Sequence, residues 1–160
     1  MHNMSGIITD SVLGAIINHP AQPAIKKCAF GGVAQRCYLI NNGQYANIKY
    51  CNYPIKQGWY QFKFTASSIA KLKELDAESK CSVVFVLTNI DDACVVPVRD
   101  LLVILSARYD ATGYEKVVPI MVNPTANGFE IFANQGHCKN KKVGLMTVPA
   151  SKFPKALFTA

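Results

Sequence analysis

The sequence predicts a single α/β domain, residues 1–160, in which a mixed central β-sheet is flanked by about three helices. Half of the 160 residues are apolar, which is enough for one domain to bury a core. Strand-like segments alternate with helical ones, and an Asn-Gly pair between two strand-like runs is a strong hairpin signal. The chain has no run of eighteen apolar residues and no basic stretch ahead of its apolar N-terminal part. We therefore expect a soluble, cytoplasmic protein that does not associate with membranes.

The predicted elements begin with a helix over 7–18, where apolar residues share one helical face until His19 and Pro20 end it. A short strand over 24–30 follows. The helix and the strand together form the entry into the main hairpin.

The main hairpin consists of strands over 36–40 and 44–51 around the turn Asn41-Asn42-Gly43, and residues 59–65 form a third strand. Side chains alternate between the two faces of a strand. This alternation divides the second strand into Tyr45, Asn47, Lys49 and Cys51 on one face and Ala46, Ile48 and Tyr50 on the other.

The next predicted element is a helix over 65–79, capped by Ser67 or Ser68. The strand over 82–88 is the most apolar, so we expect it near the centre of the sheet. The later elements are a strand over 94–98, a helix over 99–109, strands over 117–122 and 129–132, a short strand over 144–148 and a helical turn after Pro149. Residues 131–160 are expected to form a basic C-terminal extension.

This order of elements resembles the core of the PD-(D/E)xK nuclease-like superfamily, in particular its Holliday-junction-resolvase-like and restriction-enzyme-like members. The segments that carry the resemblance lie within residues 7–109 and read NNGQYANIKY, WYQFKFT and VVFVLTNIDDACVVPVRDLLVIL. The resemblance implies a restriction-endonuclease-like fold and a nucleic-acid substrate or ligand.

The resemblance also implies an active-site position for Lys49, with Asn47 where such enzymes carry an acid or Gln. Asp10 matches the helical acid that some members add as a metal ligand. An active member would need Mg²⁺, which is held by carboxylates and activates water. Residues 36–43 contain no acid, and Asn is a neutral ligand. We therefore expect a catalytically impaired relative with no cofactor, and Mg²⁺ only if catalysis survives through Lys49, Asn47 and Asp10.

Positive charge is concentrated toward the two ends of the sequence. Residues 1–68 carry six Lys or Arg against one acid, residues 69–130 carry six against nine, and residues 131–160 carry five against none. Basic regions attract phosphates, so DNA or another nucleic acid is the expected partner. The expected nucleic-acid-binding residues are Lys49, Lys56, Lys63, Lys139, Lys141, Lys142, Lys152 and Lys155, and the candidates for stacking on bases are Tyr53, Trp59 and Tyr60.

Two alternative functions stay open. An active Mg²⁺-dependent DNA endonuclease would take its acids from outside the motif or from the second subunit of a homodimer. A protein-binding accessory or inhibitor protein of a mobile element would use the same scaffold as a surface, because one fold hosts many functions. The six cysteines contain no CxxC pair, which argues against a zinc site and favours structural thiols.

Overall fold

The computed structural model describes residues 4–20, 23–28, 37–41, 43–90, 92–113, 115–135, 138–150 and 153–158. The helices in these ranges are α1 (Met4–Ile17), α2 (Ala66–Glu78) and α3 (Val98–Thr112), with short 3-10 turns η1 (Thr88–Ile90) and η2 (Lys155–Leu157). The strands are β1 (Ile25–Lys27), β2 (Cys37–Ile40), β3 (Gln44–Cys51), β4 (Tyr60–Thr65), β5 (Lys80–Leu87), β6 (Asp92–Pro97), β7 (Val117–Thr125), β8 (Gly128–Gln135) and β9 (Cys138–Pro149). Of the helices in the described residues, none has the length and hydrophobicity that a membrane crossing requires.

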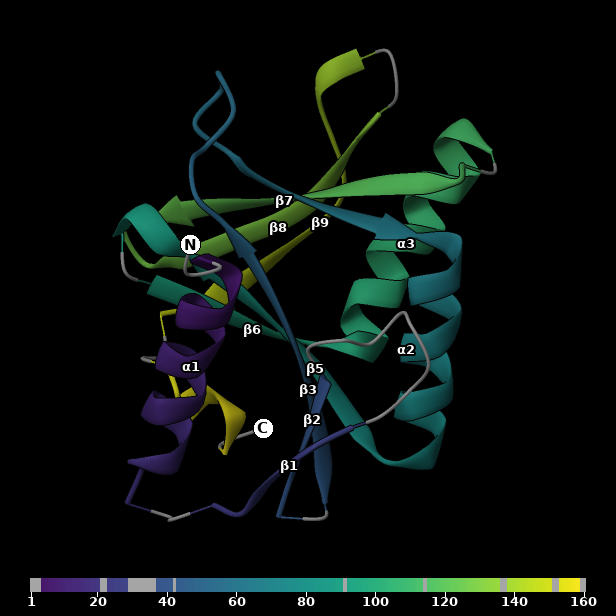
Figure 1. Ribbon diagram of the computed structural model, residues 1–160. Coiled ribbons are helices and arrows are strands. Elements are labelled where there is room, and N and C mark those ends of the chain that lie inside the picture. Colours follow the sequence, from purple (N-terminus) through teal and green to yellow (C-terminus); the bar gives the residue numbers. More distant parts are fainter. Residues whose placement is uncertain are drawn as a thin grey trace.

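The strands form two sheets instead of the one central sheet that we predicted (Figure 1). Sheet A is mixed and has the order β1-β2-β3-β5-β6, in which β3 and β5 are parallel. Sheet B is antiparallel and has the order β4-β7-β8-β9. The predicted hairpin is present as β2 and β3, but β4 leaves it and pairs with β7. The eight-residue loop 52–59 is long enough to carry the chain from sheet A to sheet B. A two-residue turn would instead have paired β4 with β3.

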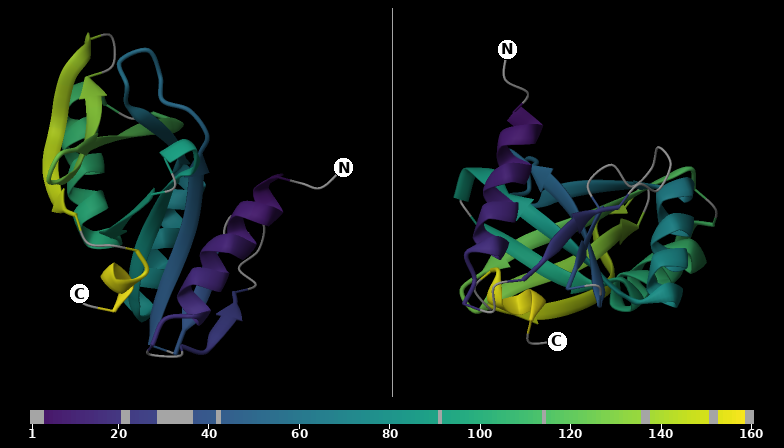
Figure 2. Two further views of the ribbon diagram at one scale, coloured as in Figure 1. Left: turned by 90° about the vertical axis from the view of Figure 1, so that its left-hand side faces the viewer. Right: turned by 60° about the horizontal axis from the view of Figure 1, so that its bottom comes forward.

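The main core lies between the two sheets and is closed at the side by α2 and α3 (Figure 2). Its centre is aromatic: the Phe62 and Phe85 rings are 4.6 Å apart, and the Phe64 and Phe85 rings are 6.1 Å apart. Alternation along β4 directs its three large aromatic side chains inward and leaves Gln61 and Lys63 on the outer face of sheet B.

A second core covers the opposite face of sheet A. Here α1 packs through Val12 and Ile16, and η2 adds Leu157. Ile48 of β3 belongs to this cluster whereas Tyr45 belongs to the main core, so the predicted alternation along β3 is confirmed. Sheet A is therefore buried on both faces, which explains why seven of the eight residues of β5 are buried.

Two predicted details differ from the structure. The N-cap of α2 is Thr65, whose Oγ1 accepts a hydrogen bond of 3.1 Å from the Ser68 backbone N–H, so neither Ser67 nor Ser68 is the cap. The strands after α3 are also much longer than predicted, and β8 and β9 place Ile131 and Phe132 in fully buried positions. Residues 131–135 and 138–149 are thus part of sheet B, and most of the basic C-terminal region that the structure describes is built into the fold.

Candidate nucleic-acid interface

Lys49 lies between the two sheets. Its Nζ donates a hydrogen bond of 3.1 Å to the backbone carbonyl of Lys63 and lies 4.4 Å from the centre of the Phe64 ring. β4 is an edge strand of sheet B, so among the described strands none pairs with this carbonyl on its outer side. The lysine of the predicted motif therefore joins sheet A to the edge of sheet B.

The three residues of the predicted catalytic set do not all come together. Asn47 lies two residues from Lys49 on the same face of β3, as the alternation predicts. Asp10 belongs to α1, which covers the opposite face of sheet A, and its side chain is outside the described residues. In the part of the chain that the structure describes, no group of three or more His, Cys, Asp or Glu side chains is arranged to hold a metal ion.

Loop 52–59 is held in a defined shape at its base and at its tip. At the base, Thr88 Oγ1 donates to the Asn52 side chain at 2.9 Å. At the tip, the Gly58 N–H donates to the Ile55 carbonyl at 2.8 Å, and Gly58 has a φ of 82°, which suits glycine. Lys56 lies within this tight turn and is exposed. A lysine at an ordered turn can meet a phosphate without first ordering a loop.

The three aromatic residues proposed for base stacking have different surroundings. Tyr53 is 76% exposed. Trp59 is half-buried, and its ring meets the Phe132 ring edge-on at 4.9 Å. Tyr60 is buried and donates a 2.6 Å hydrogen bond to Asn89 Oδ1, so it is not available to a base. Of the three, Tyr53 offers a free ring.

The outer face of sheet B carries a cluster around Lys142. The Lys142 Nζ lies 5.0 Å from the centre of the Phe132 ring and 5.9 Å from that of Trp59, within the range of cation–π attraction. It also donates 2.7 Å to Glu130 Oε2, which accepts a second hydrogen bond of 3.0 Å from Asn123. The hydrogen bond from Lys142, followed by that from Asn123, lowers the pKa of Glu130, so Glu130 is ionised at neutral pH.

The structure places the predicted basic residues in different parts of the molecule. Lys56, Lys63 and Lys141 are exposed, and loop 52–59 and the start of β9 project from the same end of the molecule (Figures 1 and 2). We call this region the loop–sheet surface; it consists of Tyr53, Lys56, Trp59, Lys63, Lys141 and Lys142. Lys155 lies in η2, on the layer that contains α1. Lys139 is in β9, but its side chain, like the whole of Lys152, is outside the described residues.

A second charged cluster, which the sequence reasoning missed, lies at the end of α3. The buried Arg108 donates to both carboxylate oxygens of Glu115, at 2.7 and 2.8 Å, and to Asn134 Oδ1 at 2.7 Å. The hydrogen bonds from Arg108 lower the pKa of Glu115 in spite of the opposing effect of burial. The sequence did contain a signal, because Arg108 follows Leu101 and Leu105 at the spacing of the apolar helical face.

The cysteines behave as structural thiols. Cys37, Cys81 and Cys94 are buried, and the five cysteines whose side chains are described are free. Burial is the main cause that raises the pKa of Cys81 and of Cys94 to about 12, so both are neutral thiols at physiological pH.

Comparisons of the chain with protein families, with characterised proteins and with solved structures found no significant match. The resemblance to the PD-(D/E)xK superfamily therefore stays a prediction from the sequence pattern. The functional assignment has to come from the chemistry of the loop–sheet surface.

Proposed function

We propose that this protein binds nucleic acid through the loop–sheet surface, and that the bound strand has unpaired bases. The observation that carries the proposal is that loop 52–59 and sheet B together carry exposed lysines and an exposed aromatic ring, with Glu130 as the acid that pairs with Lys142. The sequence itself supports this arrangement, because residues 11–73 contain no Asp or Glu at all.

The lysines supply the phosphate contacts in this proposal. Lys56 on the turn and Lys63 on the outer face of β4 are exposed, and each can neutralise one phosphate with release of counterions. Lys141 extends the positive charge along β9. Lys49 contributes little direct contact, since its ammonium group already binds the Lys63 carbonyl between the sheets.

Tyr53 gives the proposal its preference for unpaired bases. A ring that is 76% exposed can stack on a base that has left its helix, but not on one inside a duplex. The Trp59 ring packs against Phe132 and Lys142, so it forms a rigid apolar surface at the end of the loop. Single strands and junctions with unpaired bases are therefore the favoured ligands.

The test is fluorescence anisotropy with a labelled oligothymidine and a labelled hairpin duplex, titrated at several salt concentrations. We expect tighter binding to the single strand and a steep loss of affinity with salt. Tyr53→Ala should weaken single-strand binding about tenfold without changing the salt slope, because stacking contributes about 1–3 kcal/mol per base. Lys63→Ala should instead reduce the slope by about 0.7.

Lys155→Ala is the matched control, because it removes an exposed lysine on the other layer of the molecule. Its affinity should equal that of the unmodified protein. Equal losses from Lys155→Ala and Lys63→Ala would show that only net charge matters, and no association of either oligonucleotide at low salt would exclude the proposed function.

A further inference from the structure

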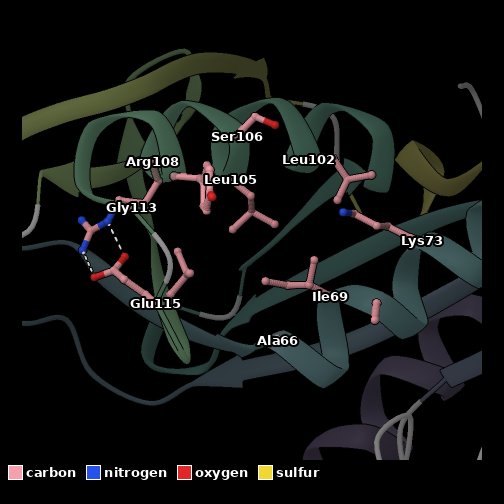
Figure 3. Close-up of a pocket in the computed structure, with 12 residues that line it drawn as sticks. Ala66, Ile69, Lys73, Leu102, Leu105, Ser106, Arg108, Gly113 and Glu115 are labelled. Carbon is pink, nitrogen blue, oxygen red and sulfur yellow. Dashed lines mark hydrogen bonds and ion pairs between the residues drawn. The ribbon is translucent and has the colours of Figure 1, made fainter.

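A groove of about 450 Å³ lies between α2 and α3 (Figure 3). Small residues line it on both helices: Ala66 and Ala70 on α2, and Ser106 on α3. The volume falls within the range of about 300–1,000 Å³ that is typical of small-molecule sites. The space is therefore large enough for a small ligand.

The walls of the groove are mainly aliphatic. Ile69 on α2 faces Leu102 and Leu105 on α3, and Val118 of β7 also lines the space. Figure 3 shows Ile69, Leu102 and Leu105 between the Arg108–Glu115 pair and Lys73. An apolar ligand body would bury its surface here, which is the main favourable contribution to binding in such a site.

The two polar ends differ in charge. At one end, Arg108 and Glu115 neutralise each other through two hydrogen bonds. At the other end, the Lys73 ammonium lies beside Leu102, as Figure 3 shows, and makes no hydrogen bond or ion pair with the described residues. The groove thus offers one uncompensated positive charge next to an apolar wall.

We propose that this groove binds an aliphatic monocarboxylate of medium chain length, with the carboxylate at Lys73 and the chain along Ile69, Leu102 and Leu105. A single cation matches a single negative charge, whereas a phosphorylated or nucleotide ligand would require further cations that these walls lack. Ser106 also lines the groove.

The test is isothermal titration calorimetry with sodium hexanoate, sodium octanoate and octanol. Each methylene that enters the groove should raise the affinity about fourfold, the equivalent of about 0.8 kcal/mol, so octanoate should bind about fifteenfold more tightly than hexanoate. Absence of octanoate binding, or equal affinity for the two acids, would overturn the proposal.

Two variants locate the ligand. Lys73→Met keeps the apolar stem and removes the charge, so octanoate affinity should fall about fivefold, the upper end for an exposed ion pair, while octanol affinity stays unchanged. Lys71→Met is the control, because Lys71 is on the same helix but pairs with Glu74 and does not line the groove. Equal effects of the two variants would contradict a role for Lys73.

Ala70→Phe tests the groove itself. Ala70 is exposed on α2, so the larger ring should enter the groove and leave the fold intact, as a thermal melt would check. Octanoate binding should be lost. Unchanged octanoate binding in the folded variant would place the ligand elsewhere and refute the proposal, while oligonucleotide binding is expected to stay unchanged in either case.

Discussion

Two ion pairs of the protein have the same N–O distance but differ in how deeply their cations are buried. Arg108–Glu115 and Lys142–Glu130 are both closed at 2.7 Å. The two carboxylates are similarly exposed, Glu115 at 28% and Glu130 at 25%, but the Arg108 side chain is 4% exposed whereas that of Lys142 is 32% exposed. A buried charge without its partner is costly, but an accessible one can exchange its partner for water or another anion. The first pair therefore contains a buried cation, whereas both side chains of the second pair are accessible to solvent.

Removal of Glu115 should have the largest effect. Glu115→Ala leaves the buried Arg108 with Asn134 alone, so the free energy of unfolding should fall by about 3 kcal/mol. Urea denaturation measures this loss. The matched Glu130→Ala variant should lose less than about 1 kcal/mol, because Lys142 can be hydrated in place. Equal losses would show that the two pairs do not differ as their exposure indicates.

Low pH should weaken the contribution of the Arg108–Glu115 pair to stability. The pKa of Glu115 is lower in the folded protein than its ordinary value of 4.5, so the stability it contributes is complete above that value and is lost as the pH falls through the folded pKa. The unmodified protein should thus be more stable than Glu115→Gln at neutral pH, and the two should converge below pH 4.5. A difference that persisted in acid would contradict this assignment.

Lys49 extends the comparison to a cation that donates a hydrogen bond to a neutral carbonyl. Lys49→Met keeps the chain over Phe64 and removes the hydrogen bond to the Lys63 carbonyl, so unfolding should become easier by about 1 kcal/mol. Oligonucleotide affinity should stay within twofold of the original. A large loss of oligonucleotide affinity in a folded Lys49→Met protein would show that Lys49 does contact the nucleic acid.

The smallest expected effect, and the sharpest for the function, comes from Glu130→Gln. This change preserves the shape of the side chain and frees the positive charge of Lys142 for a phosphate. Oligonucleotide affinity should rise about threefold and the salt slope should steepen by about 0.7, as one more phosphate contact requires. Anisotropy measures both quantities, and an unchanged slope would show that Lys142 does not face the ligand.

The sequence predicted local structure well where the signal was local. The Asn-Gly turn placed β2 and β3, and apolar periodicity placed α2 and α3. The division into two sheets was not predictable in this way, because the pairing of Tyr60 with Val122 leaves no trace in either segment alone. The pattern of apolar residues predicts which face of a strand is buried, but it does not predict which strand will pair with it.

The candidate site was predictable in its residue types and not in its geometry. The basic residues Lys56, Lys63, Lys141 and Lys142 were read directly from the charge distribution. The contact of Lys142 with Trp59 joins segments that are distant in the chain, and only the fold of sheet B brings them together. The predicted role of Lys49 came from a motif position, whereas its contacts depend on β4 leaving sheet A.

The second core has a consequence for the order in which the chain can fold. It is assembled from α1 and η2, and the rings of His19 and Phe158 stack at 4.5 Å. During synthesis α1 emerges early and η2 late, so one face of sheet A stays partly uncovered while every strand of that sheet is already made. Exposed apolar surface of this kind attracts chaperones and promotes aggregation. Residues 153–158 therefore join the second core only after every strand of sheet A has been synthesised.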